Sequence, residues 1–243
     1  MYKEKQIIRY KGDKKEKIFD PVVVEKQINV YLNGKLIFRI MCLPYEIEAL
    51  IYGFFFSNGY IDQPQEIKEL KILSSNCYIE TKKDVSLSPT VIGTSCFSSF
   101  FSIDDLVSSN KNYIDIEKFD ITKIMQKFQN MGEVYKKTGG THSAALCDEK
   151  EDIYFYSEDV GRHNAVDKVI GKAILNNFNT EGKILLTSGR ISSEIVFKSK
   201  RAKFSAIISY SSPTSLAIEV AEKFKIVLVG FARGKRYNVY TGF

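Results

Sequence analysis

The sequence lacks the two features that would direct the protein into or across a membrane. Its longest apolar stretch, residues 49–56, is too short to span a bilayer. Residues 1–20 contain neither an apolar centre nor a small-residue cleavage site, so no secretion signal is visible. We therefore expect a cytoplasmic protein that has no membrane partner.

Cysteines are few, and common nucleotide-binding fingerprints are missing. The four cysteines are spaced like neither a zinc motif nor a disulfide framework, which fits a reducing compartment. They are Cys42, Cys77, Cys96 and Cys147. The chain contains neither a P-loop nor a GxGxxG motif, so ordinary ATP or NAD binding is not indicated.

Strong charge of one sign is also missing. The 243 residues include 35 Lys and Arg against 29 Asp and Glu, which gives a net charge of +6. This balance allows an anionic ligand but is modest beside the basic surfaces of nucleic-acid-binding proteins, so we expect no nucleic-acid partner. A hydrophobic content of 44% predicts a folded core for one large domain or two small ones.

Residues 1–115 are predicted to form a smaller, strand-rich N-terminal region. Its first part, which includes the lysines between positions 3 and 17, is interpreted as a solvated polar edge. Apolar side chains alternate over residues 22–32 and 36–40, and Asn33-Gly34 between them is a typical hairpin turn.

The same region is expected to contain one helix and a loop that carries Cys96. Apolar residues at helical spacing follow Pro44 and end at Asn58-Gly59. A second hairpin is expected over residues 69–87, before a loop of small residues at 93–99.

From residue 116 to residue 243, helices and strands alternate. The expected helices cover residues 121–138, the stretch after Gly161, 192–203 and 215–224, and the expected strands cover 142–147, 152–156, 183–187, 205–209, 225–229 and 237–240. This alternation predicts an α/β domain whose largely parallel sheet has helices on both faces.

Polar side chains gather where these strands end and helices begin. Residues 158–171 place an arginine, a histidine and an asparagine at a helix N-terminus that could bind a phosphate or carboxylate. A capped, salt-bridged helix start is the alternative reading of that segment. The candidate binding residues there and in the other loops are Arg162, His163, Asn164, His142, Ser188, Gly189, Arg190, Phe231, Ala232, Arg233, Gly234, Lys235 and Arg236.

These loops are expected to meet at one edge of the sheet, because ligands of such folds bind beyond the carboxyl ends of the strands. Arginines that become desolvated there need anionic partners. The pattern therefore predicts a phosphorylated ligand that is larger than a mononucleotide.

Cys96 stands apart from the other cysteines. Small neighbours give its thiol access, and nearby cations would lower its pKa, so a thiolate at this position could hold a persulfide. The alternative is a small buried hydrophobe beside Phe97 and Phe100. Cys42, Cys77 and Cys147 lie in or beside apolar runs and are predicted to belong to the core.

Several long motifs, taken together and in order, resemble the formate dehydrogenase accessory protein family, FdhD/NarQ. They are GFFFSNGYI (53–61), TGGTHSAAL (138–146), EDVGRHNAVDKVIG (158–171), SGRISSEIVFK (188–198), SSPTSLAIEVAEK (211–223) and VGFARGKRYNVYTG (229–242). The resemblance extends from about residue 20 to residue 243.

The resemblance implies a sulfurtransferase. Members of the family take sulfur from a cysteine desulfurase and pass it to the molybdenum or tungsten bis(molybdopterin guanine dinucleotide) cofactor of the formate dehydrogenase catalytic subunit. The persulfide cysteine falls on Cys96 and the cofactor-binding stretch on residues 231–236. GDP and GTP are expected to mimic the cofactor, and the family resemblance favours a homodimer. A cofactor-binding chaperone that moves no sulfur is the alternative.

The chain departs from the family pattern in the cysteine loop, where Ser99 stands at the place of a second cysteine. This excludes a two-thiol relay within the loop but not transfer through a single cysteine. The family also resembles the cytidine deaminase fold, so we expect a three-layer α/β domain over residues 116–243. The HxE and PCxxC motifs of zinc deaminases are missing, so we expect no zinc and no other metal site.

Overall fold

The computed structural model describes residues 1–82 and 113–243, and Cys96 with its loop lies outside them. The strands are β1 (Tyr2–Lys11), β2 (Lys14–Val23), β3 (Lys26–Leu32), β4 (Lys35–Cys42), β5 (Ile67–Leu73), β6 (Asn76–Thr81), β7 (His142–Cys147), β8 (Ile153–Asp159), β9 (Ile184–Thr187), β10 (Ala206–Ser209), β11 (Val227–Arg233) and β12 (Arg236–Thr241). The α-helices are α1 (Ile47–Ser57), α2 (Ile121–Asn130), α3 (Glu133–Thr138), α4 (Arg162–Leu175), α5 (Ser193–Arg201) and α6 (Ser215–Phe224), with short 3₁₀ turns at Pro64–Glu66 and Ile116–Lys118.

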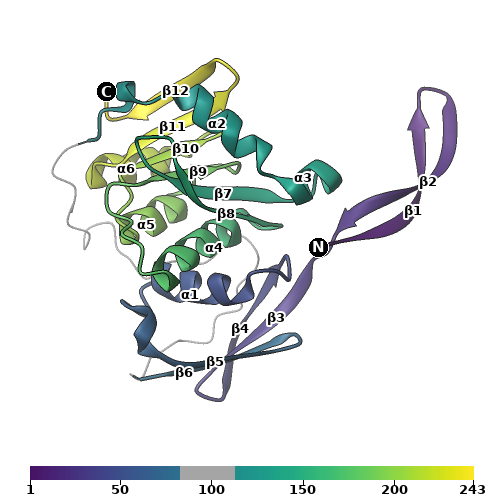
Figure 1. Ribbon diagram of the computed structural model, residues 1–243, viewed down its shortest axis with the longest axis horizontal. Coiled ribbons are helices and arrows are strands. Elements are labelled where there is room, and N and C mark those ends of the chain that lie inside the picture. Colours follow the sequence, from purple (N-terminus) through teal and green to yellow (C-terminus); the bar gives the residue numbers. More distant parts are fainter. Residues whose placement is uncertain (83–112) are drawn as a thin grey trace.

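A six-stranded sheet forms the centre of the C-terminal part, in the order β12-β11-β10-β9-β7-β8 (Figure 1). The expectation of a largely parallel sheet is wrong. Only β9, β10 and β11 run parallel, while β7, β8 and β12 pair in antiparallel fashion. The reason is that the short connections of β7 to β8 and of β11 to β12 form hairpins, which join only antiparallel strands.

Helices cover both faces of this sheet, which gives the expected three layers. One apolar core joins α4, α5 and α6 to alternate residues of the strands, including Leu146, Leu185 and Ile207. A second core lies on the opposite face, where α2 packs against neighbours such as Ala145 and Leu186. The alternation of side chains along each strand supplies both cores from the same sequence.

The single helix expected over residues 121–138 is instead two helices, α2 and α3, with a break at Gly132. Glycine weakens a helix interior. The carboxylate of Glu158 on β8 also accepts hydrogen bonds from the backbone N–H groups of Val134 and Tyr135, at 3.0 and 2.8 Å. This buried acceptor satisfies the first N–H groups of a new helix, so α3 begins there in its own direction.

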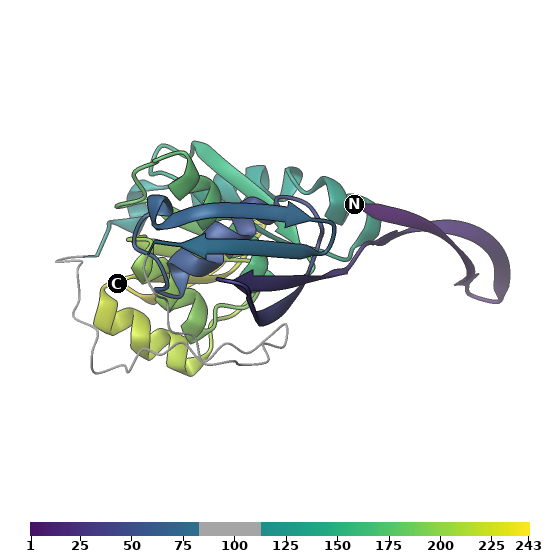
Figure 2. The same cartoon turned by 90° about the horizontal axis from the view of Figure 1, so that it is seen from below.

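The N-terminal region forms a four-stranded sheet in the order β4-β3-β6-β5, and α1 covers one face of it (Figure 2). The predicted hairpin at Asn33-Gly34 and the predicted helix after Pro44 are both present. The second predicted hairpin is also present as β5 and β6, within the described residues.

Helix α1 joins the two regions by packing directly on α4. A Cβ atom added to Gly53 would lie 1.7 Å from the backbone oxygen of Asp167, and one added to Gly171 would lie 1.8 Å from that of Ala49. The helices can therefore approach so closely only because neither glycine has a side chain. Ion pairs between Lys168 and Asp159 and between Lys198 and Asp167, each at 2.7 Å, lie beside this contact.

The first segment of the chain is not a simple polar edge. Strands β1 and β2 pair along ten positions and form an arm that projects from the rest of the molecule (Figures 1 and 2). Val22 therefore belongs to this arm, and the strand that was expected to begin with it begins at Lys26 instead. The segment has no regular alternation of polar and apolar residues, which is why the sequence pattern did not indicate these strands.

Candidate functional site

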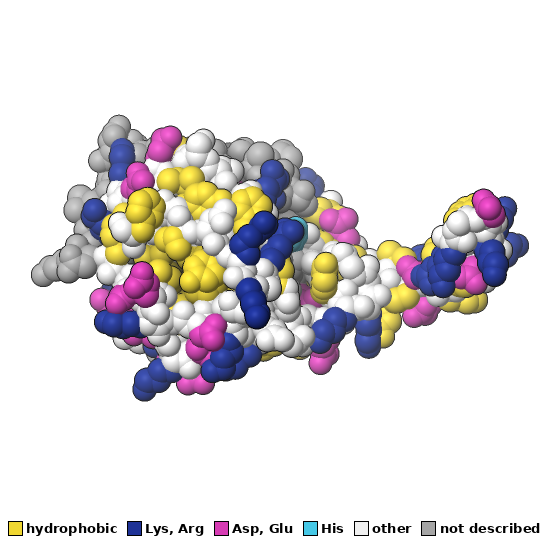
Figure 3. All heavy atoms as spheres, turned by 90° about the horizontal axis from the view of Figure 1, so that it is seen from above, with side chains coloured by type: hydrophobic (Ala, Val, Ile, Leu, Met, Phe, Trp, Pro, Cys, Tyr) yellow, Lys and Arg dark blue, Asp and Glu magenta, His cyan; other side chains and the backbone are white. Residues whose placement is uncertain are grey.

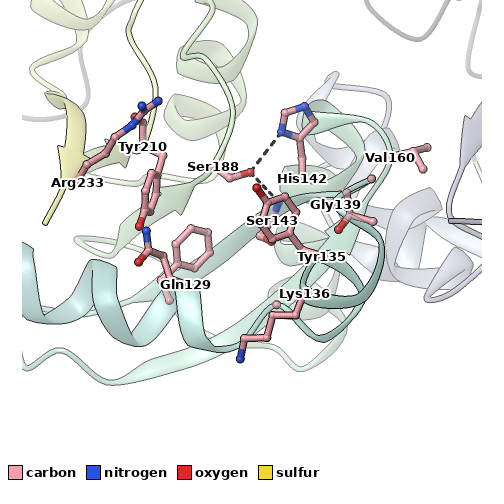
Figure 4. A pocket seen from close by; sticks show the side chains of 14 residues that line it. Gln129, Tyr135, Lys136, Gly139, His142, Ser143, Val160, Ser188, Tyr210 and Arg233 are labelled. Atoms are coloured by element: carbon pink, nitrogen blue, oxygen red, sulfur yellow. Dashed lines mark hydrogen bonds between the residues drawn. The ribbon is translucent and has the colours of Figure 1, made fainter. Parts of the chain in front are cut away.

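A cavity of about 710 Å³ opens beside α3 at the ends of several sheet strands (Figure 4). Its lining residues include Tyr135 and Lys136 of α3, His142, Ser188, Tyr210 and Arg233. Ser188 and Tyr210 directly follow β9 and β10, and Arg233 ends β11. The cavity therefore lies at the carboxyl ends of the parallel strands, which is where ligands bind in open α/β sheets.

Ser188 and His142 form the polar centre of the cavity. The Ser188 hydroxyl oxygen accepts a hydrogen bond from the backbone N–H of Ser143 at 2.9 Å and lies 3.3 Å from His142 Nδ1 (Figure 4). The Ser143 hydroxyl in turn accepts from the phenol of Tyr156 at 2.9 Å. With its oxygen accepting from Ser143, Ser188 has its own proton available for His142, and the other ring nitrogen of His142 then carries a proton.

The environment of His142 favours the neutral imidazole. Burial lowers the pKa of His142, and the positive charges of Arg162 and His163 lower it further, while Asp159 opposes them. A neutral His142 can donate one hydrogen bond to a ligand without the cost of burying a charge.

Glu158 fixes the wall of the cavity. Besides the two N–H groups of α3, its carboxylate accepts a hydrogen bond from the Thr141 hydroxyl at 2.8 Å. One buried carboxylate thus holds both α3 and the loop at residues 139–141, and both segments line the cavity.

Two cations of the cavity donate hydrogen bonds to backbone oxygens. Lys136 Nζ donates to the backbone oxygen of Asn130 at 2.6 Å, and Arg233 Nε donates to that of Tyr210 at 2.8 Å. Within residues 1–82 and 113–243, neither forms an ion pair with an acidic side chain. Positive charge that is not neutralised inside the chain favours an anionic ligand.

Arg162, His163 and Asn164 lie at the start of α4, as expected, but they do not line this cavity. His163 Nε2 lies 2.9 Å from a carboxylate oxygen of Glu194 and 3.2 Å from the Ser192 hydroxyl. Asn164 donates to the side chain of Asp159 and to the backbone oxygen of Met41, each at 2.9 Å. Their assignment to ligand binding stays a prediction.

Gly189 and Arg190 are also placed away from the cavity lining. A Cβ atom on Gly189 would lie 2.8 Å from the Cβ atom of Arg162, so the glycine lets the loop after β9 pack against α4. Arg190 is exposed. Of the loop 188–190, only Ser188 therefore reaches the cavity.

The predicted binding stretch 231–236 is not an open loop. Phe231, Ala232 and Arg233 complete β11, Gly234 and Lys235 make the turn, and Arg236 begins β12. Phe231 has a φ of 52° at a point where the pairing register shifts, which marks a bulge. Among these residues, Arg233 lines the cavity.

The described cysteines are core residues, as expected. Cys42, Cys77 and Cys147 are fully buried. Burial raises the pKa of Cys42 to about 12 and that of Cys77 to about 11, and it raises the pKa of Cys147 as well. A thiol with so high a pKa is a poor nucleophile at neutral pH. The Cys96 prediction falls outside the described residues.

Several lining residues were not expected from the sequence, among them Gln129, Lys136 and Tyr210. The sequence could have indicated Tyr210, because this residue directly follows the predicted strand at 205–209. Gln129 and Lys136 lie on helices whose sequence pattern indicated only a solvent-exposed face and a core face.

In the described part of the chain, no group of three or more His, Cys, Asp or Glu side chains is arranged to hold a metal ion. No described helix is both long and apolar enough to cross a membrane.

The model of the FdhD/NarQ family matches residues 23–243. The chain belongs to this family. The match confirms the resemblance that the motifs indicated, and it includes both the cavity residues and the α1–α4 contact.

Relatives with assigned names extend the match to almost the whole chain. A protein named sulfur carrier protein FdhD from Listeria monocytogenes is 35% identical over 98% of this chain and 96% of its own length. One of the same name from Bacillus subtilis is 35% identical over 98% of this chain and 94% of its own length. Among solved structures, a chain described as a formate dehydrogenase accessory protein from Desulfotalea psychrophila aligns over 99% of this chain and 96% of its own, with a TM-score of 0.80 and 24% identity. That likeness supports the α/β fold.

Proposed function

We propose that the protein is a sulfur carrier for the maturation of formate dehydrogenase. The observation that carries this proposal is the family membership over residues 23–243 together with relatives named sulfur carrier protein FdhD. In this role it receives sulfur from a cysteine desulfurase and serves the catalytic subunit of a formate dehydrogenase. Both partners and the sulfur chemistry act in the cytoplasm, and the working unit is a homodimer.

The proposed substrate is the molybdenum bis(molybdopterin guanine dinucleotide) cofactor, which receives the sulfur. A cavity of about 710 Å³ is in the size range that holds one drug-sized group, so it suits one nucleotide end of this large molecule. Lys136 and Arg233 supply positive charge for a diphosphate, and His142 supplies a neutral donor. These features also suit GDP and GTP as mimics.

The proposed sulfur transfer uses Cys96. The Cys96 thiolate attacks the outer sulfur of a persulfide on the desulfurase, a new S–S bond forms, and the desulfurase thiolate leaves. An electron pair of the cofactor then attacks the outer sulfur, the S–S bond breaks, and Cys96 leaves as a thiolate. The buried positions and raised pKa values of Cys42, Cys77 and Cys147 leave them unsuited to this exchange.

Mass spectrometry of the intact protein tests the transfer. After incubation with cysteine and a cysteine desulfurase, we expect an adduct of about 32 Da that maps to Cys96, as persulfidation of a thiol adds one sulfur. The Cys96→Ala variant should carry no adduct, should bind GDP like the wild type, and should fail to support formate dehydrogenase maturation. A wild-type protein without an adduct on any cysteine would favour the cofactor-binding chaperone that moves no sulfur.

A further inference from the structure

The arm of β1 and β2 carries apolar side chains that the other described residues leave exposed. A two-stranded hairpin has no core of its own and is marginally stable in water. The arm nevertheless exposes Ile8, Tyr10 and Phe19, with exposed fractions of 46%, 66% and 69%. In the space-filling view, apolar and charged side chains both reach the surface of the projecting arm (Figure 3).

The register of the hairpin sorts its side chains onto two faces. Residues that pair directly share a face, and so do alternate residues of one strand. One face, named here the aromatic face, consists of Tyr2, Glu4, Gln6, Ile8, Tyr10, Lys15, Lys17, Phe19, Pro21 and Val23. The opposite face is the charged face, and it consists of Lys3, Lys5, Ile7, Arg9, Lys11, Lys14, Glu16, Ile18, Asp20 and Val22.

The two faces differ in whether their charged side chains form ion pairs within the described part of the chain. On the charged face, Arg9 and Asp20 already form an ion pair at 2.7 Å. On the aromatic face, Glu4 lies toward the base of the arm and Lys17 toward its tip, and neither has an ion-pair partner among the described residues. The Gln6–Phe19 pair lies midway between them.

This arrangement is complementary to itself. A two-fold axis that runs along the Gln6–Phe19 pair sets the Glu4–Pro21 pair of one chain against the Ile8–Lys17 pair of the partner subunit. Glu4 then lies diagonally across from Lys17 of the partner subunit, within reach of its long side chain, and the same contact forms a second time on the other side. Phe19 meets the partner subunit's Phe19 at the centre, where it is shielded from water. Isologous contacts of this kind are the commonest in protein dimers.

We infer that the aromatic face of the arm docks on the aromatic face of a second copy of this chain, antiparallel and around a two-fold axis. The base of the arm is fixed to the body, since the Lys137 ammonium donates to the Tyr2 hydroxyl at 3.2 Å and Val23 packs against Gly140. The inference rests on the homodimer proposed above and not on the sulfur chemistry.

Sedimentation equilibrium of the full-length protein over a micromolar concentration series tests this surface. A buried central aromatic is a typical binding hot spot, so Phe19→Glu should raise the dimer dissociation constant by at least about 30-fold. Val22→Glu is the matched control, because it places the same charge at a 42% exposed position on the charged face. It should change the dissociation constant by less than about threefold.

A charge exchange tests the two-fold geometry even if Phe19→Glu disturbs the arm itself. Glu4→Lys and Lys17→Glu should each weaken the dimer by about tenfold, and the double variant Glu4→Lys/Lys17→Glu should restore it to within about threefold of the wild type. A wild-type monomer would overturn both the homodimer and the arm contact. A wild-type dimer that Phe19→Glu leaves intact, or that the double variant does not restore, would overturn the arm contact alone. GDP binding, measured on the same samples, reports separately on the cavity.

Discussion

The α1–α4 junction and the cavity both contain cationic side chains, but among the described residues only those of the junction are paired with carboxylates. Lys168 and Lys198 are almost completely buried, and each pairs with a carboxylate at 2.7 Å. Lys136 and Arg233 in the cavity bond to backbone oxygens instead. A buried charge must find its partner inside the chain because burial removes its hydration. An exposed cation, such as Lys136 or Arg233, can keep its charge available for a ligand.

The largest expected effect comes from breaking the junction's internal pairing. Lys168→Met leaves the Asp159 carboxylate buried without its cation, and among the described residues it keeps the hydrogen bonds from the backbone N–H groups of Leu43 and Gly161 and from the side chain of Asn164. We expect the free energy of unfolding, measured by urea denaturation, to fall by about 3–5 kcal/mol. Lys68→Met removes an exposed pair with Glu80 and should cost less than about 1 kcal/mol. If Lys168→Met and Lys68→Met lowered the free energy of unfolding equally, the difference between buried and exposed ion pairs would be refuted.

The next effect tests the close approach of the helices, which brings the buried pairs together. Gly53→Ala places a Cβ atom 1.7 Å from a backbone oxygen, so α1 must move away from α4, and we expect a loss of about 3 kcal/mol. In Gly182→Ala the added atom meets nothing within 4 Å, although φ is 76°. That control should lose about 1 kcal/mol from backbone strain alone, and an equally tolerant Gly53 would show that the junction is loosely packed.

In the cavity, the comparison predicts an effect on binding rather than on stability. Arg233→Ala should weaken GDP binding by about tenfold or more in isothermal titration calorimetry, because a charged hydrogen bond to the diphosphate is lost. Arg236→Ala removes an exposed cation that does not line the cavity, so its affinity should stay within about threefold of the wild type. Unchanged affinity in Arg233→Ala would remove the cavity from the binding site.

The smallest expected effect is the pH dependence that His142 contributes. Burial and the charges of Arg162 and His163 lower its pKa below the ordinary value of 6.5, so the unfolded chain takes up a proton before the folded protein does. The contribution of His142 to the free energy of unfolding is therefore fully present above pH 6.5. It decreases as the pH falls through 6.5 toward the pKa of His142 in the folded protein. Denaturation midpoints of His142→Asn should decrease less on acidification than those of the wild type. Parallel curves would show that His142 does not contribute.

The elements of the C-terminal part were predictable because their signals are local. The strand at His142–Cys147 and the helix at Ser215–Phe224 have the predicted bounds, and both follow from short-range periodicity. The break at Gly132 was not predictable in the same way, because the carboxylate that begins α3 belongs to Glu158 on a later strand. The same limit applies to the candidate site. Strand-end position indicated Ser188 and Arg233, and the polar stretch just before a strand indicated His142, whereas Lys136 lines the cavity because α3 begins in a new direction.

By itself, the sequence determined the family, the order of the elements and the concentration of polar residues at the strand ends. Motifs and periodicity depend only on residues that are close together in the sequence. Only the tertiary structure decided which of these polar residues face the cavity and which pair inside the protein. Asp167 bonds to Ser57, which lies 110 positions earlier in the chain, and this contact exists only because Gly53 and Gly171 let two helices meet. The direction of the arm's aromatic face is a tertiary property too, since it depends on the register between β1 and β2. Such partners are set by how surfaces pack, and packing depends on shape across the whole chain.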